Sequence, residues 1–193
     1  GSGAPQTDVL INPYVFATKA EKAATIIFMP LLYFKLLFFP HPLSSDYSFN
    51  QIPYRNFGDI EVWLSLLLHL AIIYCAIRLA LKKHPLGFAL GIYLGNLALV
   101  GNFFVAIGAT MGERLIYHSS LGFAMAAAGG LTALLEKLRI GDRVKRSLLF
   151  AALMIITVLA GIKTVERNAE WKNDDTLFVK DAQTASRSVL ANG

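Results

Sequence analysis

The segment GERLIYHSS brings a cation, an acid, a phenol and an imidazole together within a few residues. Its Arg114 falls where a helix is expected to begin, and a cation in the first turn opposes the helix macrodipole, which favours anions. Free backbone N–H groups and a guanidinium together make a good site for phosphate. His118 follows one helical turn later on the same face, with Tyr117 beside it. Two interpretations stay open: anion binding, or an Arg114 that pairs with Glu113 or Asp46 or extends to lipid headgroups.

A second candidate is the segment FPHPLSSDYSFNQIP, which is flanked by strongly apolar residues. Its three prolines restrict the backbone, so the polar side chains are presented in few orientations. Asp46, next to Tyr47, could act as a general base, but a lone carboxylate equally suits a solvated turn in which it bonds its own backbone. The sequence has no metal-ligand spacing, nucleophile elbow, phosphate-binding glycine loop or nucleic-acid signature. No catalytic residue or metal ligand is therefore assigned within this chain.

The composition is that of a membrane protein. The chain has 193 residues, 55% of them hydrophobic and only 16% charged, whereas soluble domains carry about 25% charged residues. The net charge of +5 does not indicate nucleic-acid binding, because the basic residues cluster at the ends of apolar segments. The single cysteine, Cys75, excludes a disulfide framework within the chain.

Four apolar stretches are long enough to cross about 30 Å of hydrocarbon as helices. We therefore predict an all-α integral membrane fold with four transmembrane helices in a region spanning residues 58–163. The expected spans are residues 60–81, 86–107, 115–135 and 147–162. The last stretch is short for a span, and we expect it to continue as a helix leaving the membrane.

The basic residues predict the orientation, since positive charge accumulates on the cytoplasmic side. They gather at two connections, after the first and third spans: Arg78, Lys82 and Lys83, then Lys137, Arg139, Arg143, Lys145 and Arg146. The connections between spans on the opposite side hold only Arg55 and Arg114. We therefore expect a multi-pass protein whose residues 1–57 and C-terminal tail are extracytoplasmic.

The flanking segments are expected to be helical as well. Residues 17–39 form either an amphipathic helix lying in the membrane interface or a fifth span, because Lys19, Lys22 and Pro30 interrupt an otherwise apolar stretch. Residues 164–193 are expected to form an extracytoplasmic helical tail. Thr110 and Glu113 have capping-box spacing, which predicts a structural role for both.

Small and polar residues inside the spans have mainly structural interpretations. Gly87, Gly91 and Gly95 recur every four residues, a spacing typical of tightly packed helices in lipid. His69 lies near the middle of the first span. Intramembrane ionisable residues are functional candidates, but no acid or second ligand lies near His69 in its span. We favour a neutral His69 that bonds to a neighbouring helix.

Three segments in order carry a family resemblance: LFFPHPLSSDYSFNQIP, GERLIYHSSLGF and WKNDDTLF. They resemble the C-terminal membrane half of polytopic C-type glycosyltransferases with tetratricopeptide repeats, which include transmembrane O-mannosyltransferases targeting cadherins and bacterial, Bacteroidetes-like, relatives. The resemblance implies transfer of a mannose-like sugar from a polyprenyl-phosphate donor to a protein or glycan hydroxyl on the extracytoplasmic side. It also implies that the helical tail leads into the repeats. A bacterial inner membrane is the expected location.

The resemblance extends to individual residues. It implies that Arg114 faces the lipid-linked phosphate and that Asp46 and Tyr47 shape the donor or acceptor pocket. Glu113 and Tyr117 match the later motif, and His118 completes the substrate-binding set. The acidic motif that supplies the base in such enzymes has no counterpart here, so the base, and a divalent metal if one is used, are expected outside this chain. The chain alone would then be inactive without the N-terminal remainder of the protein.

Two other functions are compatible with the sequence. A non-enzymatic membrane scaffold would present the repeat domain and dock a partner through its glycine-rich helices, so Gly91 and Gly95 would be sensitive to substitution and Arg114 would not. A transporter fragment with His69 on its path is less favoured, because no second charge lies deep in any span and no inverted pair of broken helices is present.

Overall fold

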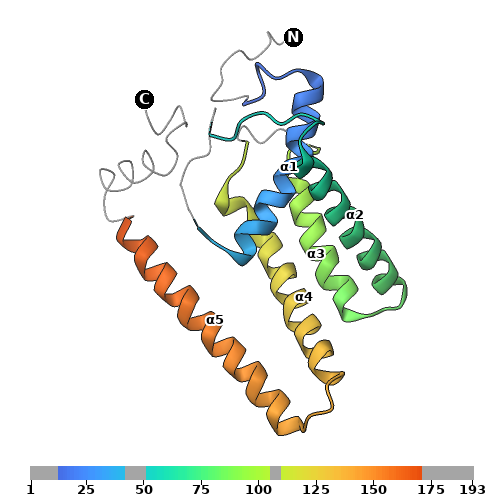
Figure 1. Cartoon of the computed structure of the whole chain (residues 1–193), viewed down its shortest axis with the longest axis vertical. Helices are drawn as coiled ribbons and strands as arrows, with labels where there is room; N and C mark the ends of the chain where they lie inside the picture. Colours follow the sequence, from blue (N-terminus) through green and yellow to red (C-terminus); the bar gives the residue numbers. More distant parts are fainter. Residues whose placement is uncertain (1–12, 42–50, 105–109, 171–193) are drawn as a thin grey trace.

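The computed structural model describes residues 13–41, 51–104 and 110–170 of the chain. Within these ranges it contains helices and no strand. The helices are α1 (Lys19–Phe38), α2 (Ile60–Leu81), α3 (Pro85–Val100), the short 3₁₀ helix η1 (Glu113–Ile116), α4 (Tyr117–Glu136) and α5 (Asp142–Glu170). α2, α3 and α4 pack together, α1 crosses their upper part, and α5 runs at an angle away from α4 (Figure 1).

Three helical segments are long and apolar enough to cross a membrane: Ile60–Leu81, Glu113–Glu136 and Asp142–Ala169. The predicted all-α membrane class is therefore confirmed. The turns from α2 to α3 and from α4 to α5, in or beside which the clustered basic residues lie, are at one end of the bundle (Figure 1). η1 and the start of α1 lie toward the other end.

The second predicted span, residues 86–107, is too long. α3 has 16 residues and ends at Val100, which corresponds to about 24 Å of helix. Gly101 is its C-cap, and Asn102 takes the left-handed conformation with φ of 59°. Glycine and asparagine tolerate the backbone conformations that end helices, but the apolar residues that continue beyond them concealed this stop in the sequence.

The last two spans also differ from the prediction. η1 and α4 together cover Glu113–Glu136, close to the expected 115–135, but neither starts with a side-chain cap hydrogen bond. The predicted capping box of Thr110 and Glu113 is therefore wrong. α5 has 29 residues and extends well beyond the expected 147–162 at both ends, as anticipated for its C-terminal end. The rest of the tail, residues 171–193, lies outside the described residues.

Glycines make the close contacts between helices, but only some of those expected to. A Cβ on Gly122 of α4 would lie 2.4 Å from the backbone nitrogen of Tyr93 in α3, and one on Gly87 would lie 2.4 Å from that of Ala80 in α2. Among the described residues, nothing lies within 4 Å of such a Cβ on Gly91 or Gly95. Of the three regularly spaced glycines of α3, only Gly87 therefore lies at a helix contact within the described residues.

The second half of α1 packs into the bundle. Its Met29 and Tyr33 are fully buried in a cluster with Val62 of α2 and Leu97 of α3. Phe34 makes edge contacts with Tyr93 and with other rings of α2 and α4. Thr25, one turn before Met29, is also fully buried. The interfacial position of this helix stays a prediction.

Candidate functional site

The start of α1 is held by a capping box that the sequence analysis did not identify. The Glu21 backbone N–H donates to the Thr18 hydroxyl at 3.2 Å, and the Thr18 N–H donates to the Glu21 carboxylate at 2.8 Å. The Thr18 hydroxyl also donates to this carboxylate at 2.8 Å, and the two bonds that the carboxylate accepts from Thr18 lower the pKa of Glu21. Thr18 and Glu21 have the spacing expected of such a cap, so the signal was present in the sequence.

The chain before α2 is anchored on α1 through Arg55. Its backbone N–H donates to the buried Thr25 hydroxyl at 2.8 Å, and its guanidinium lies 4.5 Å from the centre of the Phe28 ring. Asp59 and Glu61 approach the same guanidinium at 4.0 Å each. Arg55 therefore joins the loop, α1 and the first turn of α2. The sequence analysis did not identify this structural role of Arg55.

A second anchor joins α1 to the segment that carries Arg114. The Gly112 N–H donates to the Tyr33 hydroxyl at 3.1 Å, although the two residues are 79 apart in the chain. Tyr33 is fully buried, and burial raises its pKa to about 12. Met111, which precedes η1, and Ile116, its last residue, also join the core. η1 is therefore fixed at its start and on its apolar face.

The polar side chains of this motif point away from the core. Arg114 and His118 are exposed, and Tyr117 is 75% exposed, with its ring 5.7 Å from that of His118. Glu113 is partly buried at the start of η1. The structure thus brings these four predicted residues together as neighbours on η1 and the first turn of α4, on an outward-facing surface.

The other predicted pair, Asp46 with Tyr47, lies outside the described residues. The described chain resumes at Gln51, just before the Arg55 anchor, and it is described up to His41 after α1. Within the described residues, no group of three or more His, Cys, Asp or Glu side chains is arranged to hold a metal ion.

His69 has the structural role favoured by the sequence analysis. Its Nδ1 lies 2.9 Å from the Ser65 carbonyl oxygen, which requires an N–H there, so Nε2 accepts from the Tyr93 hydroxyl at 3.1 Å. The Ser65 hydroxyl in turn donates to the carbonyl of Ile27 in α1 at 2.6 Å. A neutral His69 thus belongs to a polar chain that joins α1, α2 and α3.

These helices and anchors define a multi-pass, all-α membrane protein with a polar, core-anchored motif at one end. Residues 1–73 match the family model described as protein O-mannosyl-transferase TMTC, DUF1736. The chain is 26% identical over 195 residues to protein O-mannosyl-transferase Tmtc3 of Drosophila melanogaster, an alignment that covers 98% of this chain and 21% of that protein. The resemblance to transmembrane protein O-mannosyl-transferases is thereby confirmed, while the repeats and the bacterial relatives stay predictions.

Other relatives agree. Protein O-mannosyl-transferase tmtc2 of Xenopus laevis is 33% identical over 90 residues, which is 47% of this chain and 10% of that protein. Human TMTC4 is 26% identical over 188 residues, covering 92% of this chain and 24% of that protein. The chain thus spans about a quarter or less of the length of these relatives. No solved structure matches it.

Proposed function

We propose that this chain is the C-terminal membrane part of a glycosyltransferase that moves a mannose-like sugar from a polyprenyl phosphate to a hydroxyl of a protein or glycan. The observation that carries this proposal is the similarity to protein O-mannosyl-transferases along 98% of the chain. The remainder of the same protein, an acceptor protein and membrane lipid are its expected partners.

In the proposed reaction the acceptor hydroxyl oxygen attacks the anomeric carbon of the sugar. The bond from that carbon to the phosphate oxygen breaks, and polyprenyl phosphate leaves with the electron pair. The hydroxyl proton goes to a base outside this chain. Arg114 then has the role of stabilising the negative charge that develops on the leaving phosphate, a form of electrostatic catalysis that depends on prior positioning of the cation.

The anchoring of η1 supports this role. Gly112 is bonded to Tyr33 of α1, and Ile116 is buried, so the backbone that carries Arg114 is held between two fixed points. Arg114 is exposed. The segment η1 that carries it lies toward the end of the bundle opposite the basic turns (Figure 1). A rigid backbone with a solvent-accessible cation is suited to meeting a phosphate that arrives from the membrane surface.

The remaining candidates have accessory roles in the proposal. Asp46 and Tyr47 shape the donor or acceptor pocket, and Tyr117 and His118 border Arg114 on its exposed face. Glu113, partly buried beside Arg114, orients the motif. In a bacterial source the protein would lie in the inner membrane, with this motif and the helical tail, leading into repeats, on the extracytoplasmic side.

The test is Arg114→Ala in the intact protein, with Arg78→Ala as the matched control. Arg78 lies in the last turn of α2 at the other end of the bundle, over the Tyr74 ring. We expect Arg114→Ala to weaken polyprenyl-phosphate mannose binding or turnover about tenfold or more, because a charge-assisted contact to phosphate is lost. Arg114→Lys should recover part of it. Normal donor affinity and turnover in Arg114→Ala would show that Arg114 does not bind or stabilise the donor phosphate.

A membrane scaffold is the second candidate, and one observation favours it. Gly91 and Gly95 are exposed on α3, with no described neighbour near their Cα hydrogens, so a helix of a partner could approach them closely. This function predicts that Gly91→Leu with Gly95→Leu abolishes assembly with a partner while Arg114→Ala has no effect. The transferase function predicts the reverse sensitivity in a sugar-transfer assay.

A further inference from the structure

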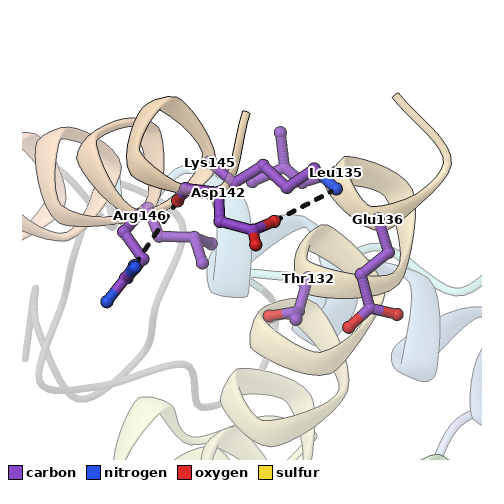
Figure 2. A pocket seen from close by; sticks show the side chains of 7 residues that line it. Thr132, Leu135, Glu136, Asp142, Lys145 and Arg146 are labelled. Atoms are coloured by element: carbon purple, nitrogen blue, oxygen red, sulfur yellow. Dashed lines mark hydrogen bonds and ion pairs between the residues drawn. The ribbon is translucent and has the colours of Figure 1, made fainter. Parts of the chain in front are cut away.

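Two depressions flank the first turns of α5, at the end of the bundle far from η1. One, of about 510 Å³, is lined by Arg143, Arg146, Ser147 and Phe150. The other, of about 320 Å³, lies between α4 and α5 (Figure 2). Its lining consists of Thr132, Leu135, Glu136, Asp142, Lys145, Arg146 and Leu149. Arg146 lines both, so it separates the two depressions.

The residues that line each depression share one helical face. Arg143, Arg146, Ser147 and Phe150 follow the spacing of neighbours along one side of a helix. The face toward α4 has the same spacing of three or four residues, at Asp142, Lys145, Arg146 and Leu149. In each case the cations lie on the first turn and the apolar side chain lies one turn deeper along the apolar helix. The first depression is therefore basic at its mouth and apolar one turn further along α5, whereas the second is lined by two cations and two acids.

Acidic residues neutralise this region only in part. Five basic and two acidic side chains occur between residues 136 and 146. The Lys145 ammonium lies 3.9 Å from the Asp142 carboxylate, and the Arg146 Nε lies 3.5 Å from the Asp142 carbonyl oxygen. Both distances are at the long end for such contacts. The cations therefore keep donor capacity for another acceptor.

The protein surface beside these depressions is apolar and uncovered by the described chain. α4 is the main contact partner of α5. The apolar stretch of α5 has no residue buried by the described part of the chain. α5 diverges from α4 beyond the turn (Figure 1). Acyl chains fit along such a surface, and an anionic headgroup complements the basic mouth; basic pockets between membrane helices bind anionic lipid headgroups.

We propose that the turn between α4 and α5 is a binding site for an anionic phospholipid, with the phosphate between Arg143 and Arg146 and the acyl chains along the apolar faces of α4 and α5. The site differs from general basic enrichment at cytoplasmic turns, because the cations border defined depressions that continue into apolar surface. It is independent of the proposed transferase activity.

The test compares lipids retained by the purified full chain in mixed micelles containing equal amounts of phosphatidylglycerol and phosphatidylcholine, measured by native mass spectrometry. The wild-type chain should retain phosphatidylglycerol preferentially. Arg143→Gln with Arg146→Gln should reduce that preference about tenfold or more, since each basic side chain near a lipid phosphate contributes several-fold. Arg143→Lys with Arg146→Lys should keep most of it and shows whether the fold tolerates substitution here.

The matched control is Lys82→Gln with Lys83→Gln. This pair removes the same charge from the other basic turn, whose residues line neither depression. It should leave the lipid preference within about twofold of the wild type. Equal retention of both lipids by the wild type, or an equal loss in the control pair, would overturn the proposal. So would a variant of Arg143 and Arg146 that keeps the full preference.

Discussion

At the scale of single residues, the main feature is how few polar side chains organise a largely apolar chain. Ser65, His69 and Tyr93 form one line of hydrogen bonds that crosses three helices and ends on the carbonyl of Ile27. Hydrogen bonds between helices in lipid contribute modestly, about 0.6 kcal/mol on average. Their directionality, however, selects one rotation of each helix, which apolar contacts alone specify poorly.

Tyr93→Phe tests this polar chain. It removes the hydroxyl that donates to His69 Nε2, and it leaves a partly buried ring nitrogen without that donor. We expect the free energy of unfolding to fall by about 0.5–1.5 kcal/mol, measured by unfolding in mixed micelles. Tyr74→Phe, on the exposed face of α2, is the control and should change little. An equal effect of the two variants would contradict a role for the hydrogen bond.

Tyr33 gives the fold a dependence on alkaline pH. Burial raises its pKa from 10.0 to about 12, while the hydrogen bond from the Gly112 N–H acts in the opposite direction. Between these values the unfolded chain loses the phenol proton and the folded chain keeps it, so stability is complete below pH 10 and falls as the pH rises toward 12. The expected loss is on the order of 1 kcal/mol from pH 10 to pH 11.

The measurement is the unfolding free energy across this pH range in the wild type and in Tyr33→Phe. The pKa values of Tyr14 and Tyr54 are also raised, mainly by burial, so the variant should keep part of the dependence. Its slope should nevertheless be shallower. Identical slopes would mean that Tyr33 is accessible to solvent in the folded protein.

At the scale of elements, the backbones of α3 and α4 approach each other closely at Gly122. Gly122→Ala would place a Cβ 2.4 Å from the Tyr93 backbone nitrogen and 2.6 Å from the Ala89 carbonyl oxygen, and backbone atoms cannot move aside as a side chain would. We expect a loss of about 1–3 kcal/mol in the free energy of unfolding.

Gly91→Ala is the matched control, because a Cβ there meets no described atom within 4 Å. It should be neutral or stabilise α3 by up to about 1 kcal/mol through helix propensity. Unfolding of both variants in the same micelles compares them directly. If Gly122→Ala were as stable as Gly91→Ala, the helices would have to cross at another point.

At the scale of the whole molecule, the arrangement of the turns supports the predicted orientation. Both basic turns lie at one end of the bundle and η1 lies toward the other (Figure 1). We predict that, in cells, His41→Cys reacts with a membrane-impermeant maleimide and Gly141→Cys reacts only after permeabilisation, both in a Cys75→Ala background. His41 and Gly141 are exposed. Labelling of Gly141→Cys in intact cells would show that the orientation is opposite to the predicted one.

Much of the fold was predictable because its signals are local. The bounds of α2, residues 60–81, were predicted as observed, since a continuous apolar run ends in basic residues at the turn. The bounds of α3 were not, because continued apolarity concealed the stop at Gly101 and Asn102. Arg114 and its neighbours were proposed as site residues from their unusual chemistry, and that role stays a prediction, whereas Arg55 was counted only as a topology charge.

The sequence by itself determined the class of the protein, because the length and apolarity of its helices and the placement of its basic residues are set by neighbours along the chain. Only the tertiary structure decided which polar groups pair. Tyr33 and Gly112 are 79 residues apart, and Ser65 lies 38 residues from Ile27. Such partners depend on how helices rotate and cross. The same geometry decided that Gly122, and not Gly91, lies at a contact.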